Sequence, residues 1–127
     1  MIIIDNDGTI TLYQGDSGEL VVSGLDAEKS YTVFFAVQDE NRNLIGQELQ
    51  VAVSNSDTVT FILTSEFTDL FTVPKNKPYK IYYYGIKVSE NNTTTEDTLF
   101  IANSTYGDLN RIIVYPRKVK GVNNGTI

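Results

Sequence analysis

The sequence predicts an all-β fold, an antiparallel sandwich of seven to eight strands with one short helical clip. The apolar residues are mainly Val, Ile, Leu, Tyr and Phe, and β-branched and aromatic side chains fit the pleated surface of a sheet. Short stretches alternate apolar and polar residues with a period of two, as strands with one buried face do. Turn signals rich in Gly, Asn and Asp separate these stretches at close spacing, which is typical of a sandwich.

The first half of the chain supplies five expected extended segments, at 2–4, 9–14, 19–23, 31–38 and 44–53, the last broken at Gly46. The strongest is 31–38, where Tyr31, Val33, Phe35 and Val37 share one face and Phe34 lies opposite. Asp7-Gly8 predicts a tight turn, and the polar run 39–43 predicts a hairpin loop.

The second half supplies strands at 58–64, 79–88, 98–102 and 111–115, with a helical run from Ser65 to Phe71 between the first two. Ser65 is the expected cap, because its hydroxyl can accept an unpaired amide of the first turn. The run is too short to be stable alone, so we expect it to pack between strands.

The expected core includes aromatic residues from three strands. Tyr82, Tyr84, Ile86 and Val88 share one face of the strand 79–88, while Tyr83 and Lys87 lie on the other. Burial is expected for Phe35, Phe61 and Tyr84.

Length and charge limit the classes of function. The 127 residues predict one domain at 1–120 and a small polar tail at 121–127, flexible or docked on a partner. A net charge of −6 argues against a nucleic-acid partner, and the basic run 117–120 predicts a local protein contact or a solvated face. No window is long and apolar enough for a membrane span, and no signal peptide is expected at the first residues. We expect a protein folded inside a cell.

The residue types present do not favour catalysis. The sequence contains no His and no Cys, which removes the commonest general base, thiolate chemistry and disulfides. The carboxylate pairs Asp39/Glu40 and Glu96/Asp97 fall in expected hairpin loops, where charged pairs are usually solvated. We therefore expect no enzyme activity, no cofactor and no metal.

The segment 5–11 resembles the middle of a calcium-binding loop, but a hairpin turn is the better interpretation. In that register Ile3 and Gln14 would occupy the first and the bidentate ligand positions, which neither side chain can serve. A weak surface calcium contact is the alternative.

Tyrosine is the sequence's most conspicuous aromatic residue, with eight Tyr and no Trp. Tyr83 is expected to face outward beside Lys87, where packing on the sheet surface or contact with another protein is the favoured role. Carbohydrate stacking by Tyr83, Tyr106 or Tyr115 is the alternative.

A series of short motifs carries a family resemblance. They are Gln14-Gly15-Asp16, then Tyr31, Val33 and Phe35 before Asp39, then 58–64, then Thr68, Leu70 and Phe71, then 82–88, and finally Thr98-Leu99. In this order they resemble the small immunoglobulin-like modules of tailed bacteriophage virions, and among these the N-terminal domain of phage baseplate upper proteins. The resemblance covers residues 10–101.

The resemblance implies an immunoglobulin-like sandwich that acts as a noncatalytic structural protein of the virion, in the tail, baseplate or neck. Its partners would be other virion proteins, within a homo-oligomer or a lattice assembled in the host bacterial cytoplasm. A capsid decoration or head-fibre anchor protein is one alternative, and a carbohydrate-binding module for a host glycan is another. The residues expected to dock partners are Ile2, Ile3, Ile4, Tyr83, Arg117, Lys118, Lys120, Val122 and Ile127.

Overall fold

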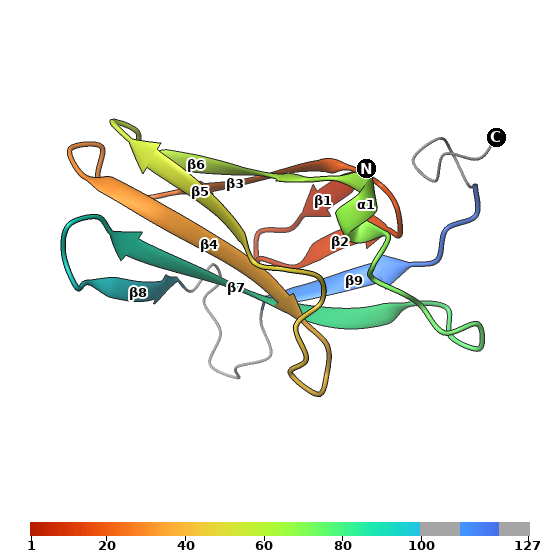
Figure 1. Cartoon of the computed structure of the whole chain (residues 1–127). Helices are drawn as coiled ribbons and strands as arrows, with labels where there is room; N and C mark the ends of the chain where they lie inside the picture. The colour runs from red at the N-terminus through yellow and green to blue at the C-terminus, as the bar shows by residue number, and fades with distance from the viewer. Residues whose placement is uncertain (100–109, 120–127) are drawn as a thin grey trace.

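The computed structural model describes residues 1–99 and 110–119, which form nine strands and one short helix (Figure 1). The strands are β1 (Ile2–Ile4), β2 (Ile10–Tyr13), β3 (Gly18–Ser23), β4 (Ser30–Gln38), β5 (Leu49–Ser54), β6 (Thr58–Leu63), β7 (Lys80–Glu90), β8 (Glu96–Leu99) and β9 (Arg111–Tyr115), and the helix is α1 (Ser65–Thr68).

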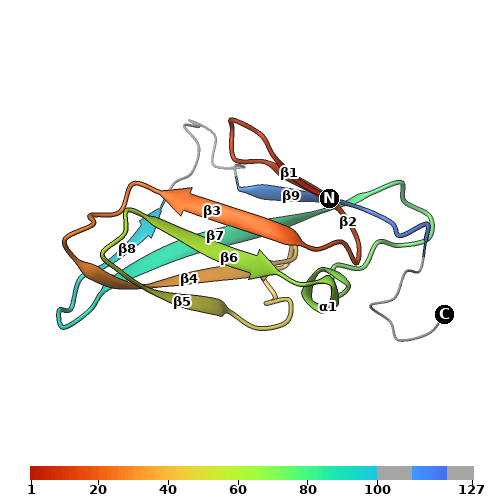
Figure 2. The same ribbon diagram turned by 90° about the horizontal axis from the view of Figure 1, so that it is seen from above.

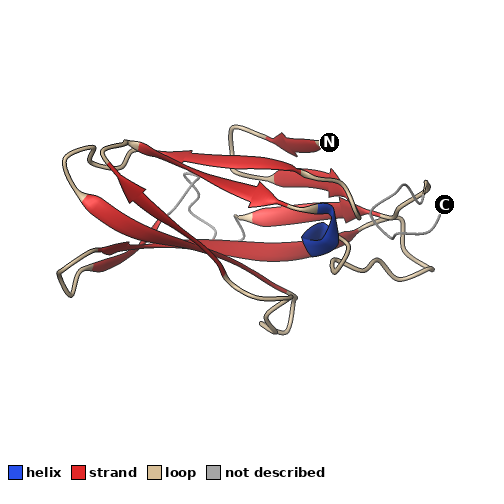
Figure 3. Cartoon of the chain, turned by 45° about the horizontal axis from the view of Figure 1, so that its top comes forward, coloured by secondary structure: helices blue, strands red, loops and turns tan. Residues whose placement is uncertain are grey.

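The strands form two layers. The larger sheet has seven strands in the order β1-β2-β9-β7-β4-β5, with β8 paired to β7, and the smaller sheet pairs β3 with β6. Figure 2 shows the smaller sheet lying across the larger one, and Figure 3 shows that the regular secondary structure of the described residues is strand apart from the one short helix. The predicted all-β sandwich is confirmed.

The core lies between the two layers, and the predicted faces of the strands are correct. On β4, Val33, Phe35 and Val37 are fully buried, and on β7 every second residue from Tyr82 to Val88 is buried. Phe35 lies against Phe61 and Tyr84, with ring centroids 5.7 and 5.5 Å apart. One aromatic cluster therefore joins both sheets.

One strand pair departs from the predicted antiparallel arrangement. β9 lies between β2 and β7 and runs parallel to β2, with Ile10 opposite Ile112 and Tyr13 opposite Tyr115. Parallel neighbours cannot be joined by a hairpin, and these two are separated by most of the chain. Local alternation contains no signal for such a pair, so the prediction was wrong there.

Two predicted strands have different limits in the structure. The expected strand 44–53 begins only at Leu49, because Gly46 has a φ of +70° and Leu44 makes just an isolated bridge to Gln38. The expected strand 98–102 starts earlier, at Glu96 in β8, and its part beyond Leu99 lies outside the described residues.

The helical clip packs as predicted, but a different residue caps it. Thr64 is the N-cap, and its Oγ1 accepts a hydrogen bond of 3.1 Å from the backbone amide of Phe67. Ser65 is already the first helical residue, so its hydroxyl cannot take that position. Phe67 stacks edge-on against Phe71 at 5.2 Å, and Phe71 lies 5.4 Å from Tyr82, which anchors the clip to β7.

The cap assignment gives a first prediction. Thr64→Ala should lower the free energy of unfolding by about 1 kcal/mol, because the Phe67 amide loses its side-chain acceptor. Ser65→Ala is the matched control and should change stability by less than about 0.5 kcal/mol. Urea unfolding monitored by circular dichroism measures both, and a larger loss in Ser65→Ala would contradict the assignment.

Candidate functional site

Residues 1–99 and 110–119 contain no group of three or more Asp or Glu side chains arranged to hold a metal ion. No helix in this part of the chain is long and apolar enough to cross a membrane. Two of the carboxylates singled out in the sequence form ion pairs: Glu40 with Lys80 and Glu96 with Lys87, each at 3.5 Å. Glu96 and Asp97 lie in β8 and not in the expected loop. Asp39 accepts hydrogen bonds from the amides of its own loop, and that of Asn43 is the main cause of its lowered pKa.

The segment 5–11 forms the predicted hairpin turn. The amide of Gly8 donates to the Asp5 carbonyl at 3.0 Å, and the Asp5 amide donates to the Thr9 carbonyl at 2.9 Å. Asp7 accepts a hydrogen bond of 3.0 Å from the Thr9 amide, which lowers the pKa of its carboxyl group. The Asp7 carboxylate therefore stabilises the turn itself.

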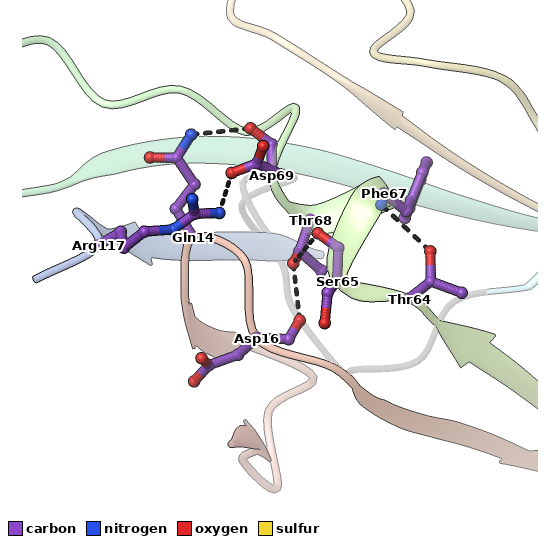
Figure 4. A network of polar contacts seen from close by, with 8 residues as sticks. All are labelled: Gln14, Asp16, Thr64, Ser65, Phe67, Thr68, Asp69 and Arg117. Carbon is purple, nitrogen blue, oxygen red and sulfur yellow. Dashed lines mark hydrogen bonds and ion pairs between the residues drawn. The ribbon is translucent and has the colours of Figure 1, made fainter. Parts of the chain in front are cut away.

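A polar network surrounds the end of α1 and ties it to two distant segments (Figure 4). Thr68, which is fully buried, donates from Oγ1 to the Asp16 carbonyl at 2.6 Å. Gln14 donates from Nε2 to the Asp69 carbonyl at 2.7 Å, and the Arg117 guanidinium pairs with the Asp69 carboxylate. The turn after β2 and the segment after β9 are thereby held to the clip.

Arg117 is consequently not a free docking residue, and that expectation is corrected. Its side chain is only 16% exposed, and its guanidinium lies against Gly15, where an added Cβ would clash with it. Lys118, by contrast, is exposed as expected. The expected docking residues Lys120, Val122 and Ile127 lie outside the described residues, as does the whole tail 121–127.

The apolar run Ile2–Ile4, expected both to be a strand and to dock a partner, is part of the larger sheet. It forms β1, an edge strand paired antiparallel with β2. Ile2 packs against the core and against Gly18, whereas Ile3 and Ile4 are 50% and 40% exposed. Two of the three side chains remain accessible to a partner, but the backbone is part of the sheet.

The outer face of the larger sheet contains a hollow of about 400 Å³. Residues of β4, β7 and β8 and of the loop before β5 line it. They include Phe34, Ala36, Gln38, Glu48, Tyr83, Gly85, Lys87, Glu96 and Thr98. Tyr83 faces outward as predicted and is 37% exposed. We call this feature the outer hollow.

The same face carries a row of three tyrosines, two from the adjacent strands β2 and β9 and one, Tyr79, from the residue just before β7. Tyr13 lies 5.5 Å from Tyr115 between ring centroids, and Tyr115 lies 6.1 Å from Tyr79. A second hollow of about 540 Å³ is lined by Tyr79 and by Tyr83, which also lines the outer hollow. Tyr106, the other expected stacking residue, lies outside the described residues.

The smaller sheet and the turn after α1 expose apolar side chains that were not predicted from the sequence. Val21, Ile62 and Leu70 are 55%, 58% and 49% exposed. Ile62 and Leu70 line a hollow of about 530 Å³ together with Phe67 and Leu49. We call Val21, Ile62 and Leu70 the β6 patch. The signal that could have revealed it is Ile62 itself, an apolar residue at an outward position between the inward Phe61 and Leu63.

The fold belongs to the immunoglobulin-like class of all-β sandwiches. No family model matches the sequence, and no curated protein matches it. Among solved structures the chain is similar to the periplasmic chaperone SfaE, with a TM-score of 0.60 and 9% sequence identity. The match covers 89% of this chain and 56% of the chaperone chain, so this chain spans little more than half of that protein. At this identity the likeness concerns the fold alone.

Proposed function

We propose that this chain is a noncatalytic structural protein of a tailed bacteriophage virion, a component of the tail, baseplate or neck that acts through protein–protein contacts. The observation that carries the proposal is the β6 patch, an apolar surface on the smaller sheet. Residues 10–101 resemble virion modules, and in a virion such a surface would be covered by a neighbouring protein.

The β6 patch has the features of a protein contact surface. Ile62 lies opposite Glu19 in the pairing of β3 with β6, and Val21 is its diagonal neighbour on the same face. Leu70 continues the surface across the hollow beside α1. Contiguous exposed apolar side chains next to a hollow are typical of sites where another protein docks.

Unpaired strand edges add a second, directional kind of contact. Among the described strands, β6 pairs only with β3, and β5 pairs only with β4. Each therefore keeps one edge whose backbone amides and carbonyls can pair with a strand from a partner. A capsid decoration or head-fibre anchor protein would use the same contacts at a different position on the particle.

The test is incorporation into phage particles. Mass spectrometry of purified virions that carry the gene should find the protein at a fixed copy number, and Ile62→Glu should lower that number by about tenfold, since it puts a charge in the contact. Leu44→Glu, at a residue that is 49% exposed in the loop after β4, is the control and should leave the copy number unchanged.

Two further measurements make this test decisive. The melting temperature of Ile62→Glu should fall by only a few degrees, because Ile62 is already exposed and the one new unfavourable contact is the charge opposite Glu19. Light scattering across concentration should give a defined oligomer for a self-assembling tail component and a monomer for a module that docks on a pre-built lattice. Absence of the wild-type protein from virions, or normal incorporation of Ile62→Glu, would overturn the proposal.

A further inference from the structure

We propose that the outer hollow is a binding site for a neutral saccharide. The hollow lies on the larger sheet, on the face opposite the core, whereas the β6 patch lies on the smaller sheet. The two proposals therefore concern different surfaces, and either can fail without the other.

The floor of the hollow is made by two small residues. Gly85 on β7 lies directly opposite Ala36 on β4. A Cβ built on Gly85 would meet no heavy atom of residues 1–99 and 110–119 within 4 Å, and Gly85 is not among the glycines with positive φ. Neither its backbone conformation nor a neighbour in the described part of the chain requires glycine at this position, although glycine within a strand costs stability. A glycine at such a position leaves free space above the sheet. Glycines of this kind are found where a ligand approaches the backbone closely.

Aromatic side chains stand on both sides of this floor. In the pairing of β4 with β7, Tyr83 lies opposite Gln38 and Lys87 opposite Phe34, one row to either side of Gly85 and Ala36. Tyr83 and Phe34 are thus separated along the strand direction by the length of four residues, about 13 Å. Both line the hollow, and their rings can stack on the apolar C–H faces of sugar rings.

Polar side chains around the hollow match the hydroxyl groups of a saccharide. Gln38 supplies both a donor and an acceptor, Thr98 supplies a hydroxyl, and Glu48 supplies a carboxylate. Lys87 and Glu96 face each other at 3.5 Å, and both side chains remain about half exposed. A few convergent polar groups beside aromatic walls are the usual composition of a small-molecule site.

Charge decides between classes of saccharide. The hollow is lined by two carboxylates, Glu48 and Glu96, and one ammonium, Lys87, and the chain carries a net charge of −6. This balance disfavours sulfated, phosphorylated or uronic-acid polymers through like-charge repulsion. A neutral oligosaccharide has no such cost. The tyrosine row lies on the same face, and a longer chain could reach it through the second hollow, which shares Tyr83.

The test is calorimetric titration of the purified full chain with cellohexaose, maltohexaose and chitohexaose, with polygalacturonate as the anionic comparison. We expect at least one neutral hexasaccharide to bind, and Tyr83→Ala to weaken that binding by about tenfold through lost stacking. Gly85→Leu should abolish it by filling the hollow. It should still fold, because its side chain enters open space.

Ile62→Ala on the smaller sheet is the matched control and should bind as the wild type does. Circular dichroism melting should show that Tyr83→Ala and Gly85→Leu remain folded at the titration temperature. The proposal is overturned if none of the three neutral hexasaccharides binds, if binding survives Gly85→Leu, or if polygalacturonate binds more tightly than all of them. Each of these results would leave the virion proposal as it stands.

Discussion

Replacing Phe35 with alanine is expected to lower the free energy of unfolding by about 3–5 kcal/mol. Phe35 is fully buried in the middle of β4 and is packed against Phe61 of the smaller sheet and Tyr84 of β7. Its truncation would leave a cavity between two sheets whose backbones are held by their strand pairing, so the site cannot collapse easily. Urea unfolding followed by tyrosine fluorescence and circular dichroism measures the loss.

The neighbouring residue provides the matched control. Phe34 has the same side chain but lies on the outer face of the sheet, where it is half-buried. Phe34→Ala should therefore cost less than half as much as Phe35→Ala. If Phe35→Ala fails to fold, Phe35→Leu should still fold with a smaller loss, since it leaves a smaller cavity. Equal losses at the two positions would mean that the faces of β4 are assigned incorrectly.

The strands that local sequence predicted well are those with a large apolar residue at every second position. In 31–38 and 82–88 these positions form the face in the core, although Phe34 and Tyr83 also place aromatic side chains on the outer face. The strand 111–115 was predicted with its correct limits, but not its parallel pairing with β2. Direction and neighbour depend on the path of the whole chain, so alternation could not supply them.

The candidate sites were predictable only in part, for a similar reason. The outward position of Tyr83 follows from alternation alone. The outer hollow, however, depends on the register that sets Gly85 opposite Ala36, and the Arg117–Asp69 pair joins residues 48 positions apart. The sequence alone therefore predicts a docking patch at the basic run 117–120. In the folded chain one of its charges, that of Arg117, instead pairs with Asp69.

Tyr84 is expected to make the stability of the protein depend on pH in the alkaline range. Its hydroxyl donates a hydrogen bond of 2.6 Å to the carbonyl of Gly8 in the turn before β2, and its ring is 6% exposed. Burial, with a smaller contribution from the negative charge of Asp7, raises the pKa of Tyr84 to about 12. In the unfolded chain the pKa of a tyrosine is about 10.

The direction of the effect follows from these two values. The folded state holds the phenol proton more tightly, so the stabilisation is fully present below about pH 10 and is lost as the pH rises towards about 12. A difference of two pKa units corresponds to about 2.7 kcal/mol, and the full loss is reached only above about pH 12. Tyr84→Phe should therefore be less stable than the wild type at pH 7, because the Gly8 carbonyl loses its donor, and this deficit should shrink above pH 10.

Urea unfolding of the wild type and Tyr84→Phe at intervals from pH 7 to 11.5 measures this convergence. Lysine titration affects both proteins alike and cancels in the difference between them. Tyr83→Phe, which removes an exposed hydroxyl but keeps Tyr84, should follow the wild type throughout. A stability difference between wild type and Tyr84→Phe that stays constant above pH 10 would show that the Tyr84 phenol is not held protonated by the fold, and that its bond to Gly8 is not protected from solvent.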